Sequence, residues 1–186
     1  MRMREATKNG GDEVKPGDGQ NQNCVCILGY GVEFTNFKCE SVDKDFCEID
    51  KCFLKSVNRT YKYSSLKIKL LRIPVTKVKI NFALYKRFNG YKPFLYNITL
   101  DACKFLENRN SNPGASYFFD IWEDISNMNH SCPYNHDIEI EKMSTEHLNH
   151  HITNILPFPN GRYMFEIHWK AYDIKRAVTQ LYLSFT

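Results

Sequence analysis

The sequence lacks the features that mark several large classes of protein. It has no run of about 18 apolar residues, so a membrane-spanning helix is not indicated. Its seven cysteines form no paired CxxC knuckles, and neither an HExxH motif nor a cofactor-binding loop occurs, which argues against zinc ribbons and common enzyme classes. The net charge is only +4 and the lysines are dispersed, a weaker bias than nucleic-acid binders usually show.

What the chain does contain favours a secreted domain. Its 186 residues are 42% apolar, enough for one packed core. Three N-glycosylation sequons begin at Asn58, Asn97 and Asn129, and together with the cysteines they favour an oxidising, secretory setting. The polar start MRMREATKNGG has no apolar segment of the kind a signal peptide carries. We therefore expect residues 1–28 to be disordered or not the native start, and one domain over 31–186.

Most of that domain has the period of β-strands. Leu66, Ile68 and Leu70 alternate with lysines, as do the apolar residues from 78 to 84. Asn89-Gly90 then predicts a hairpin, because both residues tolerate positive φ. The returning strand, KPFLYNITLDAC, places Asn97 on the face opposite its apolar side chains, where a glycan could lie in solvent. Further strands are predicted within HDIEIEKM, RYMFEIHWKAYD and RAVTQLYLSFT.

One segment departs from this pattern. Between Cys103 and Cys132 apolar residues recur at helical spacing, and Asn112-Pro113-Gly114 divides the segment. We expect a helical insertion over about 104–130. The segment STEHLNHHITNIL can be interpreted as strand or helix. Seven to nine short antiparallel strands predict an all-β fold, an immunoglobulin-like antiparallel β-sandwich.

Several stretches resemble one insect family, mostly from flies, that is catalogued as domain of unknown function ten-ninety-one. The resemblance covers residues 32–186 and rests on VEFTNFKC (Val32–Cys39), KSVNRTYKY (Lys55–Tyr63), NGYKPFLYN (Asn89–Asn97), DACKF (Asp101–Phe105), NMNHSCPYNHD (Asn127–Asp137), LPFPNG (Leu156–Gly161) and AYDIKRA (Ala171–Ala177). The family is similar to the chemosensory-B proteins of flies and, more distantly, to the ML lipid-recognition domains and the ganglioside activator protein.

The resemblance implies a secreted, disulfide-bonded sandwich that opens between its sheets to hold acyl chains, with no catalytic residues. Two departures stand out. This chain shows no signal peptide, and it has Cys47 where the family usually has another residue, which would leave an odd thiol.

The cysteines allow two interpretations. Cys39 and Cys52 lie on successive predicted strands, while Cys103 ends a strand and Cys132 precedes one, so bridges Cys39–Cys52 and Cys103–Cys132 are predicted. The alternative is a Cys132 nucleophile assisted by His130 or His136, which needs a free thiolate within reach of a base. The secretory features favour the disulfides, and a bridge that closes a loop as long as the one between Cys103 and Cys132 would stabilise the fold by about 3–4 kcal/mol.

Clusters of histidine and lysine also have two interpretations each. Five of the six histidines fall between His130 and His151, which permits a metal site or, more simply, a solvated loop; we predict no metal. The lysines at 67, 69, 77 and 79 would project from one side of two strands. Because the aromatic residues fall on the opposite face, we predict a solvated surface with no nucleic-acid partner, although contact with a membrane surface or a receptor stays open.

The predicted inner faces are strongly apolar. Periodicity alone leaves open whether they fill a core or line a cavity, and the resemblance to lipid-recognition domains favours a cavity. Its predicted lining consists of Phe82, Leu84, Phe94, Ile98, Leu100, Phe165, Ile167, Trp169, Leu181 and Leu183, with Phe118, Ile121, Trp122 and Ile125 forming a lid on the helical insertion.

These features together predict a secreted, monomeric, non-enzymatic protein without cofactor. Its partner would be a hydrophobic small molecule, such as a lipid, fatty acid or pheromone-like compound, with a role in chemosensation. The alternative is a secreted protein-interaction module with a filled core. An interior void would distinguish the two.

Overall fold

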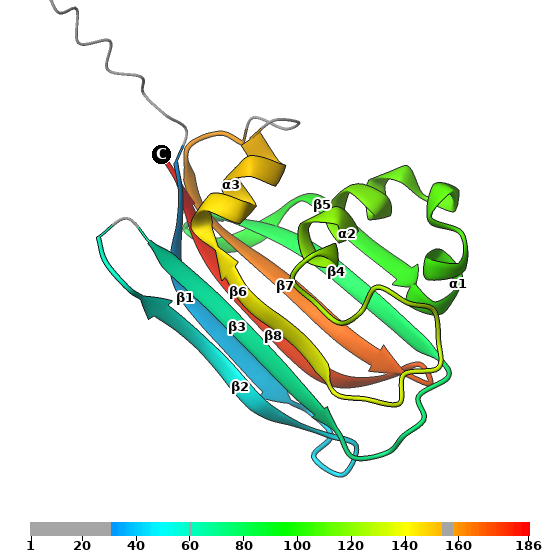
Figure 1. The fold of residues 1–186 in the computed structure, drawn as a ribbon. Coiled ribbons are helices and arrows are strands. Elements are labelled where there is room, and N and C mark those ends of the chain that lie inside the picture. Colours follow the sequence, from blue (N-terminus) through cyan, green and yellow to red (C-terminus); the bar gives the residue numbers. More distant parts are fainter. Residues whose placement is uncertain (1–30, 60, 154–157) are drawn as a thin grey trace, which may run out of the picture.

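A computed structural model describes residues 31–59, 61–153 and 158–186, and within them two antiparallel sheets pack as a sandwich (Figure 1). The larger sheet has the strand order β1-β8-β7-β4-β5. Its strands are β1 (Val32–Ser41), β4 (Val78–Phe88), β5 (Gly90–Asp101), β7 (Gly161–Ala171) and β8 (Ile174–Phe185). The predicted hairpin at Asn89 joins β4 to β5, and Gly90 there has a φ of +96°. The strand pairings in both sheets are antiparallel, so the predicted class is confirmed.

The smaller sheet has the order β2-β3-β6, with β2 (Cys47–Ser56), β3 (Lys62–Leu70) and β6 (Ile138–Ser144). Its central strand turns Leu66 and Ile68 inward, where both side chains are only 3% exposed. The disulfide Cys39–Cys52 joins β1 to β2 and so ties one sheet to the other. The sandwich is therefore held along one side by a covalent bond as well as by burial.

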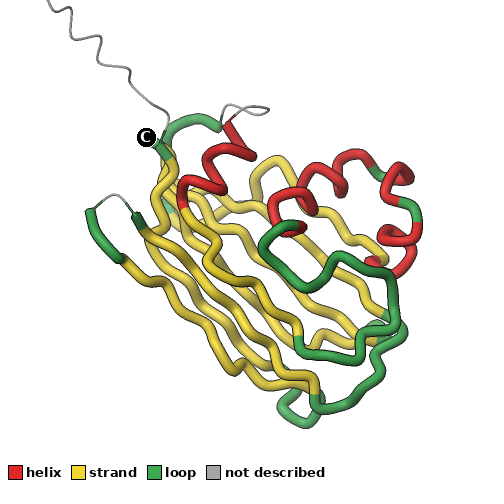
Figure 2. The backbone as a smooth tube through the Cα atoms, in the orientation of Figure 1, coloured by secondary structure: helices red, strands yellow, loops and turns green. Residues whose placement is uncertain are grey.

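Short helices occupy the space that the smaller sheet leaves uncovered (Figure 2). They are α1 (Ala102–Glu107), a 3-10 turn (Arg109–Ser111), α2 (Pro113–Glu123) and α3 (Thr145–Thr153). Asp101 caps α1 by accepting from the Lys104 amide, and Asn112 caps α2 by accepting from the Ala115 amide. Pro113 stands in the first turn of α2, where its missing N–H costs nothing.

The helical insertion is confirmed with altered limits. The helices span 102–123 rather than 104–130, because the Asp101 cap starts α1 early and α2 ends at Glu123. Ile125 consequently lies beyond α2, in a loop that leads to β6. Within the ambiguous segment, Thr145–Thr153 form helix α3, in agreement with one of the two interpretations left open. The predictions for residues 1–28 fall outside the described residues.

Candidate ligand-binding cavity

A partly open cavity of about 140 Å³ lies between the two sheets and the helical segment. Twenty-seven residues line it, and of these only Lys170 and Arg176 are charged. Lys170 pairs in register with Lys79 on β4, and their neighbours Ala171 and Ile80 line the cavity. Because successive strand side chains point to opposite faces, both lysines point away from the interior. The side chain of Arg176 is thus the charged group nearest to an otherwise apolar space.

The helices form one wall of the cavity. On α2 this wall consists of Ala115, Phe118, Phe119 and Trp122, and on α1 of Ala102, Phe105 and Leu106. The Phe118 ring lies 4.5 Å from the ring of Phe82 on β4, measured between centroids. The insertion therefore packs on the sheet through aromatic contacts at one edge and leaves a void beside them.

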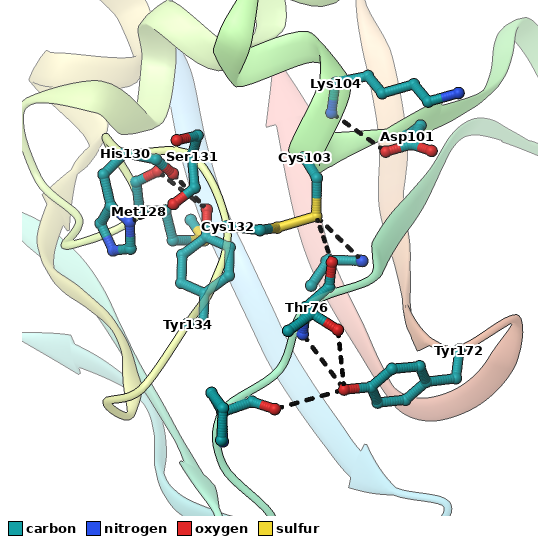
Figure 3. Close-up of a disulfide and its surroundings, with 12 residues drawn as sticks. Thr76, Asp101, Cys103, Lys104, Met128, His130, Ser131, Cys132, Tyr134 and Tyr172 are labelled. Atoms are coloured by element: carbon teal, nitrogen blue, oxygen red, sulfur yellow. Dashed lines mark hydrogen bonds between the residues drawn. A yellow bond between two sulfur atoms is a disulfide. The ribbon is translucent and has the colours of Figure 1, made fainter.

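The disulfide Cys103–Cys132 fixes both ends of this helical wall (Figure 3). It joins α1 to the loop that carries Met128 and Tyr134, two further residues of the lining. The Tyr134 hydroxyl donates to the carbonyls of Met128 and His130, at 3.2 and 3.0 Å. Burial raises the pKa of Tyr134 to about 12. The loop is thus held by the disulfide and by the two hydrogen bonds of the neutral Tyr134 hydroxyl.

A charged corner closes one end of the cavity. Arg176 forms an ion pair with Asp43, and its guanidinium lies 4.2 Å from the centroid of the Phe46 ring. Its Nε also donates to the carbonyl of Ala171 at 3.4 Å. Beside it, the free thiol of Cys47 is 1% exposed, and burial raises its pKa. A protonated, buried thiol is a poor nucleophile, so this corner is suited to packing rather than to covalent chemistry.

Half of the predicted lining residues do line the cavity: Phe82, Ile98, Leu100, Phe118, Trp122, Ile167 and Trp169. Phe165 and Leu181 line a smaller void of about 20 Å³ next to it. The other five line neither cavity: Leu84, Phe94, Ile121, Ile125 and Leu183.

The positions of these five have a physical cause. Leu84 and Leu183 are fully buried towards the end of the sandwich where Tyr163 packs against Phe94, Phe158 and Phe185. Aromatic side chains fill that end. Ile121 is 2% exposed in the core, and Ile125 is displaced from the lid because α2 has already ended.

Sequence reasoning missed the contribution of the smaller sheet and the loops. Ile68, Leu70, Ile138 and Ile140 line the cavity from β3 and β6, together with the loop residue Val75. The alternation along both strands was visible in the sequence and could have indicated them. Nothing in the sequence marked Val75, whose position depends on a bridge to Tyr134.

The disulfides overturn the alternative of a cysteine nucleophile. Both predicted pairs, Cys39–Cys52 and Cys103–Cys132, are formed. Cys132 is therefore no free thiolate. The predicted odd thiol of Cys47 is confirmed as the free cysteine of the described residues.

The histidines contact one another and the backbone. The Nε2 atoms of His130 and His136 lie 2.7 Å apart, at the surface near Cys132. On α3, His147 donates from Nε2 to the carbonyl of Ile121 at 2.8 Å, and this contact ties α3 to α2. His151 in turn donates from Nδ1 to the carbonyl of His147 at 2.8 Å. Across the part of the chain that the structure describes, no group of three potential metal ligands is found.

The four lysines that were expected on one face belong to different parts of the fold. Lys67 and Lys69 belong to β3, whereas Lys77 precedes β4 and Lys79 lies within it. The prediction of a single basic face is therefore wrong, because the chain crosses from one sheet to the other between Leu70 and Val78. Lys67 forms ion pairs with Asp137 and Glu139, as expected for a solvated surface.

Glycosylation at the three predicted asparagines stays a prediction, and all three side chains are exposed as it requires. Asn97 is exposed on the outer face of β5, as the pleat indicated, and its side-chain oxygen accepts from Asn81 at 2.8 Å. Asn129 is exposed in the loop after α2. Asn58 is exposed as well, while Thr60 of its sequon lies outside the described residues.

The fold and cavity define the class: a disulfide-bonded β-sandwich with short helices and an apolar interior void. Residues 80–165 match the family described as "Protein of unknown function (DUF1091)", so the chain contains a domain of this family over these residues. The match runs from β4 to β7 and includes the helical insertion, a shorter span than the expected 32–186. No curated protein matches the chain.

Two disulfides are typical of proteins that fold in the secretory pathway. None of the helices in the described residues is long and apolar enough to cross a membrane.

Proposed function

We propose that this protein is a secreted, non-enzymatic binding protein for a hydrophobic small molecule, a lipid, fatty acid or pheromone-like compound, with a role in chemosensation. The observation that carries the proposal is the apolar cavity of about 140 Å³. Apolar side chains that line an unfilled void lack some of their packing contacts. A ligand in the void replaces those contacts and so stabilises the folded protein. Each ligand methylene buried there would contribute about 0.8 kcal/mol.

Binding would work by sequestration. The inner faces of both sheets and the helical wall would remove the ligand's tail from water, and the region around Arg176 would face its more polar end. No cofactor is needed for this role. Disulfide-bonded Cys132 and protonated Cys47 support a non-enzymatic protein. The protein would act as a monomer without nucleic acid.

The two tryptophans of the chain provide the assay. Trp122 and Trp169 both line the cavity, one from the helical wall and one from β7. We expect titration with dodecanol or lauric acid to change tryptophan emission saturably, and native mass spectrometry to show a complex of one ligand per chain. Glycerol, which has no apolar tail, serves as the control ligand.

The matched control variant is Leu183→Ala, which removes a buried apolar side chain outside the cavity. It should lower stability by about 2–5 kcal/mol while the folded protein still binds the same ligands. A folded wild type that shows no saturable change with either ligand, and that retains no lipid from extracts, would defeat the proposal.

A further inference from the structure

One end of the sandwich exposes an unusual number of large apolar side chains. Nine such side chains are exposed in the described residues, and five of them lie on three neighbouring segments: Val42 (47%), Leu71 (42%), Ile73 (53%), Tyr172 (43%) and Ile174 (54%). These segments are the loop after β1, the loop after β3, and the turn between β7 and β8 together with the start of β8. We name residues 42–46, 71–77 and 172–176 the loop rim. Single exposed apolar residues are ordinary, but five on adjacent loop tips indicate a surface that contacts something apolar.

The three segments of the loop rim are bonded to one another. The Val42 amide donates to the carbonyl of Arg176 at 2.8 Å, and the Leu71 amide donates to the carbonyl of Phe46 at 2.9 Å. The Tyr172 hydroxyl accepts from the Thr76 amide at 3.2 Å and donates to the carbonyl of Pro74 at 3.3 Å. The apolar tips are therefore held in one arrangement, and little ordering is needed when they meet a partner.

Positive charge surrounds these tips. The loop rim contains five cationic residues, Lys44, Arg72, Lys77, Lys175 and Arg176, against three acidic ones, Asp43, Asp45 and Asp173. Asp173 is shared by Lys77 and by Lys79 of β4, at 3.4 Å from the Nζ of Lys77. Lys175 is exposed at the start of β8. Apolar tips among cations match the boundary of an anionic bilayer, where acyl chains meet phosphate groups.

The loop rim also adjoins the cavity. Phe46, Val75 and Arg176, one residue from each of its three segments, line the interior void. A surface bound to the loop rim would therefore lie directly against one end of the cavity.

We propose that the loop rim docks on an anionic lipid bilayer. Ile73, Ile174 and the Tyr172 ring enter the headgroup region, and the lysines contact lipid phosphates. A bilayer fits better than a receptor protein, because cationic residues adjoin the apolar ones along the chain: Arg72 lies between Leu71 and Ile73, and Lys175 follows Ile174. Docking is independent of whether the cavity takes a ligand, so each can be tested without the other.

The test is cosedimentation of the protein with vesicles of phosphatidylcholine, with and without phosphatidylserine. The wild type should bind the anionic vesicles and lose binding as salt is raised. The double substitution Ile73→Ser and Ile174→Ser should weaken this binding by about tenfold or more, since two inserted side chains are lost. A second variant, Lys175→Gln, should weaken binding to the anionic vesicles about twofold to tenfold.

The control variant carries Phe53→Ser and Val57→Ser, which remove two apolar side chains of similar exposure (41% and 57%) at the far end of β2. It should bind vesicles like the wild type. Thermal melts and tryptophan titrations of all variants show whether they are folded and still take ligand. Failure of the wild type to bind anionic vesicles, equal binding to neutral vesicles, or an equal loss in the control variant would overturn the docking proposal; a protein receptor would then be the occupant.

Discussion

Filling the cavity from within should separate stability from ligand binding. Ala115 is 6% exposed on α2, and its side chain lines the void. The substitution Ala115→Leu adds three carbons at this position. Ala and Leu have similar helix propensities, and the Asn112 cap uses only the Ala115 amide, so α2 itself should be unaffected.

The two effects have opposite signs. Three carbons placed in an existing void gain contacts without strain, so we expect the free energy of unfolding to rise by up to about 2 kcal/mol. The same carbons displace roughly three methylenes of a ligand, at about 0.8 kcal/mol each, so ligand affinity should fall by about 2.4 kcal/mol, or about sixtyfold. Urea unfolding measures the first quantity, and tryptophan titration with dodecanol measures the second.

The matched control is Leu84→Phe, which also adds three carbons. Leu84 is fully buried but lines neither cavity, so the added carbons should overpack the interior and cost about 1–3 kcal/mol. If Ala115→Leu destabilised the protein as much as Leu84→Phe does, the interior would be filled and the reasoning refuted. Unchanged affinity in a stabilised Ala115→Leu variant would also refute it, because the ligand would then lie elsewhere.

Three further predictions concern stability and reactivity. Replacing Cys103 and Cys132 by alanine should lower the free energy of unfolding by about 3.6 kcal/mol, since the bridge spans 29 residues. Denaturant unfolding measures this loss, and a clearly smaller loss would contradict the prediction. Tyr134 has its pKa raised to about 12, so its contribution to stability is complete below about pH 10 and is lost as the pH rises through about 12. Tyr134→Phe should cost about 1 kcal/mol of stability at neutral pH and should reduce this alkaline loss. If stability fell with pH in parallel for both proteins, the assignment would be contradicted. Cys47 should react with a thiol reagent only after unfolding, and fast labelling of the native protein would count against its burial.

The strands were predictable because their residues report local geometry. Alternation along 78–84 and 94–100 gives the inward face directly, since side chains on a pleated strand alternate. The Asn112-Pro113 pair likewise predicted the division of the helical segment, and it forms the cap and first turn of α2. Patterns of this kind depend only on neighbouring residues in the sequence and not on the element that packs against them.

Which sheet a strand belongs to was harder to predict, because local patterns carry no information about distant contacts. Lys67 and Lys79 have similar surroundings in the sequence, yet they lie in different sheets. The crossing depends on the segment after Leu70, where Val75 forms a bridge to Tyr134, a residue that follows it in the sequence by two strands and the whole helical insertion. Contacts at such separation leave no periodic signal in either partner, so the basic face was predicted wrongly.

The location of the cavity follows from the unequal widths of the two layers. Five strands face three, so β4 and β5 project beyond the smaller sheet and are covered by α1 and α2 instead (Figure 1). The cavity lies at the seam between these two covers: Ile68 and Ile140 line it from the sheet, Phe118 and Trp122 from the helix. Side chains of two sheets can interdigitate regularly, whereas a short helix and a strand edge have no common spacing.

The other end of the sandwich shows what happens where no such seam exists. There Tyr163 lies 5.6 Å from Phe94, 5.7 Å from Phe158 and 5.2 Å from Phe185, between ring centroids, and the interior is full. Leu84 and Leu183, predicted as cavity lining from the same alternation as Ile167, lie towards this filled end. Periodicity therefore assigns a residue to the interior, while the position of the insertion along the strands decides whether that interior is packed or hollow.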